Sequence, residues 1–463
     1  MSAPAEGSPS PGLAREQWVA DAAEIASQIL TQVRYTRKGS MAWLGPTGYG
    51  TELSPLLTKT LGPDLTHGTT GVALFLAAVA RLRGDDGLRQ LSLAVLGPLR
   101  RKLGELRASP GEEPLRLGGM MGLGSYIYGL LTIGKLLGEP ELIDEAHAAT
   151  VLITEEQIKQ DVRVRVQTGS AGAILVLLAL HALRPHANRS GRSPLELALA
   201  CARHLLANRV SFDGRPRAWA LSPGKPPLIG FGYGAAGISH ALLRLYGVTG
   251  EPRLLEAASE GLAFVRSFYV PECGGWLDPR AVFESRYRPR RGSWPDWWNT
   301  GTLEDLEPQD REGSSERPRR FARSWCHGST GIVLGKLASL DFDDSPEVRT
   351  EIQAGLEDQV CNLGEHDLVE GRTDDLCCGH MGHVEALLFA YSRLGEERYL
   401  DAALREAEEV RRQARRRGCY NVMAARGTRR FAPMFFQGVA GIGYTFLRLA
   451  LPGDLPSVAV LES

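Results

Sequence analysis

A glycine repeat runs through the chain and restricts the folds that it can adopt. The repeat unit is a small or polar residue, then Gly-x-x-Gly, then a run of apolar residues. The first glycines of the clear copies are Gly68, Gly169, Gly234, Gly328, Gly379 and Gly438, and Gly122-Leu-Gly124 is a degenerate seventh copy. Most copies lie roughly 50–60 residues apart, which is the spacing of a repeated supersecondary unit.

Each unit predicts a turn followed by a buried helix. Two glycines permit a tight turn and a close approach of neighbouring backbone. The run that follows is apolar on nearly every face, which predicts burial. Amphipathic stretches such as 251–268 and 406–415 lie between the copies, and strand signals are weak. We therefore predict an all-α fold, an α/α toroid with seven inner and seven outer helices. An open solenoid is the alternative, but closure would gather the residues before each first glycine around one cavity.

The domain organisation follows from shifts in composition. Residues 1–14 are rich in Ser, Pro, Ala and Gly and have no apolar core typical of a signal peptide, so we expect a disordered segment. Residues 15–463 form the predicted helical domain. Within it, residues 273–322 are rich in Trp and Arg and read as an irregular insertion.

Charge and cysteine content exclude several classes of protein. Lys and Arg number 53 and Asp and Glu number 54, which gives no sign of a nucleic-acid or anionic-membrane partner. No apolar run approaches the roughly 18–20 residues that a bilayer-spanning helix needs. The seven cysteines are odd in number, sparse and in one case adjacent. They predict reduced thiols and a cytoplasmic protein rather than a disulfide scaffold.

Three cysteines fall at repeat turns. Cys326 lies two residues before Gly328, and Cys377 and Cys378 come directly before Gly379. The two turns are one repeat apart, so ring closure places them side by side. Three thiolates on adjacent turns suit a tetrahedral Zn²⁺ with one open position, and His380 and His383 are spare ligands nearby. The alternative is a group of buried free cysteines without a metal.

Several stretches resemble the lanthionine synthetase C-like family, specifically the cyclase domain of class II (LanM-type) lanthipeptide synthetases. They are Trp43-Leu44-Gly45, 67–78, 122–128, 168–175, Ser324-Trp325-Cys326-His327-Gly328, Leu376-Cys377-Cys378-Gly379 and 435–450. The resemblance covers about residue 15 to the end of the chain. The dehydratase domain of the bifunctional enzymes has no counterpart here, so the chain looks like a stand-alone cyclase or one cut from a longer protein.

The resemblance implies a fold, a metal and a reaction. Family members are α/α toroids with a zinc ion at the mouth of the ring. They add peptide cysteine thiols to dehydroalanine or dehydrobutyrine, which forms lanthionine or methyllanthionine rings. Alignment on Gly379 puts Cys377 at the family's Cys position and Cys378 at its His position. Together with Cys326, this matches the three-cysteine subset of class II enzymes.

The acid/base positions depart from the family. Arg165 stands where an Asp is usual, and Tyr233 stands where a His is usual. A tyrosine with a pKa of about 10 is a poor base at neutral pH, although it can donate a proton. Arg165 can stabilise an enolate by its charge, and His327 matches the class II pattern and is the best remaining acid. The structural alternatives are a packed aromatic for Tyr233 and a solvated charge for Arg165.

Three functions therefore stay open. The first is a zinc-dependent cyclase that acts on a dehydrated precursor peptide made by a separate dehydratase. The second is a degenerate family member that serves as a binding or scaffold partner of that dehydratase. The third is addition of a small thiol such as glutathione to a dehydrated protein. The Arg-rich run 411–430 either grips an acidic leader peptide or forms a solvated helix face.

Overall fold

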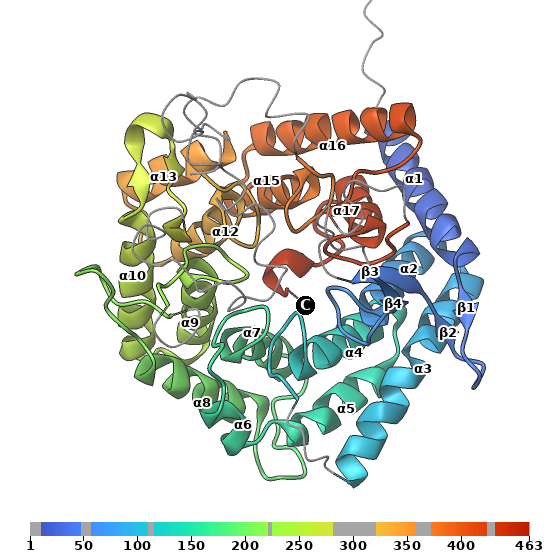
Figure 1. The fold of residues 1–463 in the computed structure, drawn as a ribbon, viewed down its shortest axis with the longest axis horizontal. Coiled ribbons are helices and arrows are strands. Elements are labelled where there is room, and N and C mark those ends of the chain that lie inside the picture. The colour runs from blue at the N-terminus through green and yellow to red at the C-terminus, as the bar shows by residue number, and fades with distance from the viewer. Residues whose placement is uncertain are drawn as a thin grey trace, which may run out of the picture.

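The computed structural model describes residues 11–47, 57–109, 115–220, 225–280, 321–357, 372–423 and 431–462. Within these ranges the chain is mainly helical, and its strands are short antiparallel pairs. The helices form two concentric rings, an inner and an outer one (Figure 1).

Each copy of the glycine repeat starts an inner helix. The first glycine of the copy is the N-cap, and the apolar run forms the helix, which is almost entirely buried. In the described ranges there are seven such helices: α2 (Thr69–Arg83), α4 (Leu123–Leu137), α7 (Ser170–His181), α9 (Ala235–Thr249), α12 (Ser329–Ser339), α15 (His380–Leu394) and α17 (Val439–Ala450).

An outer helix covers each inner helix. In the order of the inner helices from α2 to α17, the described partners are α3 (Asp86–Ala108), α5 (Pro140–Ala149), α8 (Pro194–Ala207), α10 (Pro252–Arg266), α13 (Pro346–Leu356), α16 (Glu397–Arg417) and α1 (Pro11–Thr31). The helix that comes first in the sequence therefore packs on the last inner helix. Neighbouring inner helices also contact one another around the whole ring, and α17 contacts α2. The predicted α/α toroid is confirmed, and the open solenoid is excluded.

Backbone hydrogen bonds tie the seven repeat turns into a second, smaller ring. The bonds run from Thr66 N to Met120 O, Gly119 N to Val166 O, Gln167 N to Gly232 O, Phe231 N to Trp325 O, Trp325 N to Cys377 O, Cys377 N to Phe436 O, and Phe436 N to Thr66 O, at 2.9–3.3 Å. All seven turns lie at the end of the toroid where the inner helices begin. Residues far apart in the sequence are therefore fixed side by side at this end.

The paired glycines are required by close packing of backbone. At Gly328 a Cβ atom would lie 2.1 Å from the carbonyl oxygen of Ala322, and at Gly331 it would lie 2.0 Å from that of Trp325. The φ angle of Gly328 is −118°, which any residue can adopt. Space for the neighbouring chain, rather than an unusual backbone conformation, explains the six clear copies, whereas Gly122 of the degenerate copy has a φ angle of 112°.

Short elements lie outside the two rings. The antiparallel pairs are β1 (Arg34–Tyr35) with β2 (Met41–Ala42), β3 (Leu44–Thr47) with β4 (Leu57–Thr60), and β5 (Tyr269–Val270) with β6 (Gly275–Trp276). The short helices are η1 (Thr150–Leu152), α6 (Glu155–Lys159), η2 (Pro271–Cys273) and η8 (Val458–Val460).

The structure describes residues at two of the predicted boundaries, the end of segment 1–14 and the start of the insertion 273–322. Helix α1 begins at Pro11, inside the segment 1–14 that composition predicts to be disordered, and proline is favourable at a helix start. The start of the predicted insertion is ordered, because β6 pairs with β5 and Trp276 is buried. Residues 1–10 and 281–320 lie outside the described residues.

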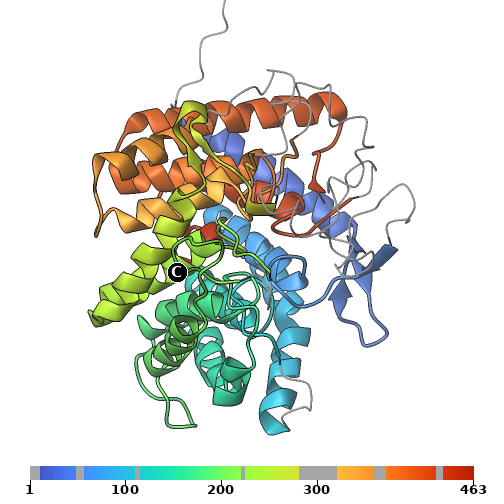
Figure 2. The same ribbon diagram turned by 60° about the vertical axis from the view of Figure 1, so that its left-hand side comes forward.

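The segment after α17 fills the centre of the ring, as both views show (Figure 1 and Figure 2). The Trp325 indole Nε1 donates to the carbonyl oxygen of Ala459 at 3.0 Å, and the Tyr128 hydroxyl donates to that of Glu462 at 2.5 Å. Val458 and Val460 are buried there.

Most arginines of α16 are held in ion pairs. Arg415 binds Asp21 of α1 at 3.0 Å, and Arg417 binds Asp374 at 2.6 Å. Arg411 pairs with Glu408 within the helix. These contacts favour the structural interpretation of the helical part of the Arg-rich run, and residues 424–430 lie outside the described ranges.

None of the helices in the described ranges combines the length and apolar character that crossing a bilayer requires.

Two glycines of α9 test the role of the repeat. A Cβ at Gly237 would lie 1.9 Å from the Phe231 carbonyl oxygen, whereas a Cβ at Gly247 meets nothing within 4 Å. We expect Gly237→Ala to lower the free energy of unfolding by about 1–3 kcal/mol through overpacking. Gly247→Ala, the matched control in the same helix, should raise it by about 0.5–1 kcal/mol. Urea denaturation measures both, and a neutral Gly237→Ala would contradict the packing argument.

Candidate metal centre

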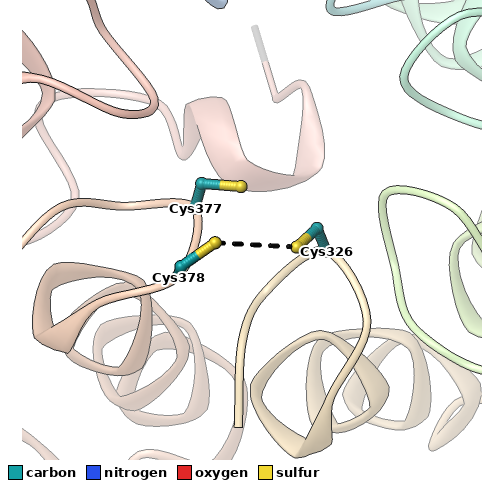
Figure 3. A group of neighbouring side chains, drawn as sticks. All are labelled: Cys326, Cys377 and Cys378. Atoms are coloured by element: carbon teal, nitrogen blue, oxygen red, sulfur yellow. Dashed lines mark hydrogen bonds between the residues drawn. The ribbon is translucent and has the colours of Figure 1, made fainter. Parts of the chain in front are cut away.

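Cys326, Cys377 and Cys378 meet on the ring of repeat turns. Cys326 belongs to the turn before α12, and the other two belong to the turn before α15. The hydrogen bond from Trp325 N to Cys377 O, at 3.0 Å, joins these turns next to the three side chains. Figure 3 shows the sulfurs gathered between the two turns.

The three sulfurs lie close enough to bind one ion. All three Sγ atoms lie within 4.8 Å of one another, and those of Cys326 and Cys378 are 4.0 Å apart. Zinc–sulfur bonds of about 2.3 Å in a tetrahedron place sulfurs about 3.8 Å apart, so small movements would complete the site. Cys326 and Cys377 are each 4% exposed, and Cys378 is the most exposed of the three.

Electrostatics also favours a cation among the thiols. Hydrogen bonds from Cys377 and Cys378 hold the pKa of the Cys326 thiol well below its usual range. The same proximity to Cys326 raises the pKa of both Cys377 and Cys378. One thiolate forms easily here, and three do not form together without a positive charge. The donor set of soft sulfur atoms therefore fits zinc.

The spare ligands expected from the sequence are engaged elsewhere. The Nδ1 atoms of His380 and His383 contact the two carboxylate oxygens of Glu406 at 2.8 and 2.5 Å. The Nε2 of His383 faces the carbonyl oxygen of Leu356 at 3.1 Å, so both of its ring nitrogens are used. Among the described residues, only the three cysteines form a group that can hold a metal.

Two aspartates before the second cysteine turn shape it, and sequence reasoning missed them. The buried Asp375 carboxylate accepts hydrogen bonds from the backbone N–H of Cys378 at 3.0 Å and of Met423 at 2.7 Å. Asp374 accepts from Asn421 N and from Arg417. The acidic pair preceding Leu-Cys-Cys-Gly was the available signal. Its partners lie nearly fifty residues later in the chain.

His327, Tyr233 and Arg165 form a stack beside Cys326. The rings of Tyr233 and His327 lie parallel, with centroids 4.7 Å apart and planes inclined by 8°. The Arg165 guanidinium lies over the Tyr233 ring, 5.1 Å from its centroid. The backbone N–H of Tyr233 donates to the Cys326 carbonyl at 3.3 Å, which joins the stack to the cysteines.

Burial changes the protonation of this stack. It lowers the pKa of His327 to about 4, so the imidazole is neutral at pH 7. It raises the pKa of the Tyr233 hydroxyl well above its usual range, so this group keeps its proton. It lowers the pKa of Arg165 to about 10, which leaves the guanidinium charged. Arg165 is 7% exposed, so the solvated charge considered from the sequence is excluded.

Sequence reasoning also missed an ion pair near His327, between Asp278 and Arg280. Asp278 is buried, and both of its carboxylate oxygens contact the Nε of Arg280, at 3.0 and 2.9 Å. The positive charge of Arg280 contributes, after burial, to the low pKa of His327. Both residues lie in the stretch that the sequence predicts to be an irregular insertion.

The other end of the toroid carries a cavity of about 1040 Å³. Its lining includes Arg81, Lys135 and Arg244, which lie near the C-terminal ends of inner helices. The inner helices begin at the cysteine end, so this cavity is separate from the metal centre.

One of the solved structures compared with the chain, nisin cyclase, agrees with the fold. Nisin cyclase aligns with a TM-score of 0.56 and 14% identity, covering 86% of this chain and 91% of that one. A sugar epimerase from a ruminal bacterium aligns with a TM-score of 0.41 and 10% identity, covering 94% and 99%. An unsaturated glucuronyl hydrolase from Streptococcus agalactiae aligns with a TM-score of 0.41 and 11% identity, covering 80% and 85%. A search of the curated proteins found no match.

The likeness to nisin cyclase supports the toroid, and the family assignment rests on the sequence. The profile of the family described as "Lanthionine synthetase C-like protein" matches residues 59–460, which is most of the chain. The match includes every copy of the glycine repeat and all three clustered cysteines. The chain belongs to the lanthionine synthetase C-like family.

Proposed function

We propose that the protein is a zinc-dependent lanthipeptide cyclase. The reaction adds a peptide cysteine thiol to dehydroalanine or dehydrobutyrine. A carbon–sulfur bond forms at the β-carbon, and the proton lost by the thiol is matched by one gained at the α-carbon. The cluster of Cys326, Cys377 and Cys378 at one site is the observation that carries this proposal.

The three cysteines would hold the metal. Bound zinc supplies deprotonation and placement of the peptide thiol, which at a pKa of about 8.5 is mostly protonated at neutral pH. The thiol would approach from the side of Cys378, the most exposed of the three. Asp375 fixes the backbone of that turn through its bond to Cys378 N.

The stack beside the cysteines would manage the proton and the developing negative charge. His327 takes up a proton on its neutral imidazole and returns one to the α-carbon. Arg165 places a positive charge where the enolate oxygen forms. Tyr233 keeps its proton and lies flat against His327, so it orients that ring and donates rather than accepts.

The substrate in this proposal is a dehydrated precursor peptide, and a separate dehydratase prepares it. One observation favours a second function. Two positions that usually carry an acid or a base in the family carry Arg165 and Tyr233, and neither is a base at neutral pH. A member that keeps the metal and binds the peptide for a partner dehydratase would have this character.

A cyclisation assay separates the two functions. We expect the purified protein to convert a dehydrated cysteine peptide into a product of unchanged mass whose thiol no longer reacts with an alkylating reagent. Cys326→Ala should abolish this conversion, and Cys419→Ala should leave it intact, because Cys419 is exposed and lies outside the cluster. Persistent alkylation together with tight peptide binding would support the binding partner instead.

Metal analysis tests the site independently of activity. We expect about one zinc per chain in the purified protein. Cys326→Ala and Cys378→Ala should each lose most of it, since two sulfurs leave an incomplete ligand set, and Cys419→Ala should retain it. Elemental analysis with circular dichroism on each variant distinguishes metal loss from unfolding. Full metal content in folded Cys326→Ala would refute the site.

Replacing Cys378 with His tests the effect of the third thiolate. Three thiolates give the site one more negative charge than two thiolates and a neutral imidazole. The incoming thiolate is therefore held less tightly and stays more nucleophilic. We expect Cys378→His to close rings more slowly and more selectively on one dehydrated peptide in a timed assay. An unchanged or faster rate would contradict this.

A further inference from the structure

Three arginines gather beside the proposed active site. Arg163 and Arg165 lie on the turn before α7, and Arg116 precedes α4 on the neighbouring repeat. Burial and then the charge of Arg116 lower the pKa of Arg163. Arg163 and Arg116 also add to the effect of burial on Arg165. The three positive charges are therefore close enough to repel one another.

Among the residues that the structure describes, no acid forms an ion pair with this cluster. In the part of the chain that the structure describes, none of the three guanidinium groups has an ion pair or a hydrogen bond. Arg165 is 93% buried, with an exposed fraction of 7%, and its Nε and Nη1 atoms are enclosed without a partner. A buried guanidinium that lacks acceptors is costly, so a bound carboxylate would stabilise this cluster.

The carboxylate of Asp161, which lies beside the cluster, is already engaged. One carboxylate oxygen of Asp161 accepts from the backbone N–H of Arg163 at 3.0 Å and of Val164 at 3.3 Å. The other accepts from Ser170, from both its N–H and its hydroxyl, at 2.6 Å. Asp161 thus builds the turn that presents the arginines and does not bind their side chains.

The turn itself is held in an unusual conformation. Val164 has a φ angle of 43°, in the left-handed region that a β-branched residue rarely adopts. The N–H of Arg165 donates to the carbonyl oxygen of Arg163 at 2.5 Å across this residue. The tight turn sets the two arginines on either side of Val164, and such strain is often found at functional sites.

The cluster has space beside it and contact with the reacting groups. A cavity of about 150 Å³ is lined by Arg116, Arg163, Thr168 and the engaged Asp161, among others. At about 30 Å³ per water molecule, it has room for a carboxylate group. The guanidinium of Arg165 lies over the ring of Tyr233. The backbone N–H of Tyr233 in turn donates to the carbonyl oxygen of Cys326.

We propose that Arg116 and Arg163, which line this cavity, bind the carboxylate of an acidic side chain in the substrate peptide, a few residues from the reacting cysteine, and that the nearby charge of Arg165 adds to the attraction. This inference rests on the proposed function, because it names a feature of the same substrate. Guanidinium groups bind carboxylates through paired, charge-assisted hydrogen bonds, and burial strengthens them. The subsite would select which cysteine of a precursor enters the site.

Binding of peptides that cannot react tests the proposal. Each peptide carries one cysteine and serine in place of the dehydrated residue, so no ring can close. A single Glu is moved from one to four residues on either side of the cysteine, and each peptide has a Gln counterpart. We expect one position at which the Glu peptide binds about tenfold more tightly than its Gln counterpart, measured by calorimetry. Equal affinity at every position would overturn the proposal.

Substitution of the arginines tests whether these side chains cause the preference for the Glu peptide. Arg163→Gln and Arg116→Gln alter side chains at or near the surface, so the fold should persist, and circular dichroism checks this. Each should reduce the preference for Glu to about twofold or less, with affinity for the Gln peptide unchanged. Arg253→Gln, an exposed arginine on α10, is the matched control and should keep the full preference. A full preference in folded Arg163→Gln and Arg116→Gln would refute the subsite.

Two further sets of peptides show which anion the subsite prefers and whether the protein closes rings. A phosphoserine peptide distinguishes the source of the oxyanion, and discrimination confined to phosphoserine would overturn the carboxylate assignment. The dehydrated forms of the same peptides separate this inference from the proposed function. A preference for Glu without ring closure would support the carboxylate subsite and contradict the proposed cyclase function. Ring closure without any preference for Glu would support the cyclase function and contradict the subsite.

Discussion

The closed ring of backbone hydrogen bonds between the seven repeat turns is the constraint on which the candidate site depends. Each turn donates to its neighbour, and the bond from Phe436 to Thr66 closes the circle. These buried peptide groups must find partners, and the partners are other copies of the same turn. Glycines permit the close approach that such bonding needs. Cysteines fifty residues apart in the sequence thus become neighbours in space.

The same ring determines the electrostatic character of this end of the toroid. Three cysteines concentrate potential negative charge at two adjacent turns. Arg165 and Arg163 lie two turns from that of Cys326, and Arg116 lies three turns from it, so positive charge gathers there with His327 and Tyr233 between the two groups. A nucleophilic thiol and an acidic neighbour on one peptide would meet complementary surroundings. The cavity at the opposite end shares none of these groups.

The sequence predicted the features that repeat and missed those that join distant segments. The glycine pattern predicted the number of inner and outer helices, because each turn and each apolar run is local. The grouping of the cysteines followed from ring closure alone. In contrast, the partner of Asp375 at Met423 and that of His383 at Glu406 depend on how α15 packs on later segments. A pattern in one stretch of sequence carries no information about such partners.

Arg165 shows the same limit of sequence-based prediction within the candidate metal centre. Resemblance to the family located the position, but only the fold shows that the side chain is buried, lies over Tyr233 and has no acceptor for its Nε and Nη1 atoms among the described residues. The outer helix α16 is the opposite case, since its arginines pair with acids on its own surface and on α1. Burial and pairing, which distinguish the two, are three-dimensional properties.

X-ray absorption spectroscopy at the zinc edge would reveal whether the three cysteines bind zinc and leave one position for a peptide thiol. We expect the zinc-loaded protein to bind the metal through three sulfur atoms and one lighter atom that an incoming thiol can replace. Addition of a cysteine peptide should change the spectrum to four sulfur atoms. A spectrum that shows fewer than three sulfur atoms, or a fourth ligand that persists when the peptide is added, would contradict this coordination.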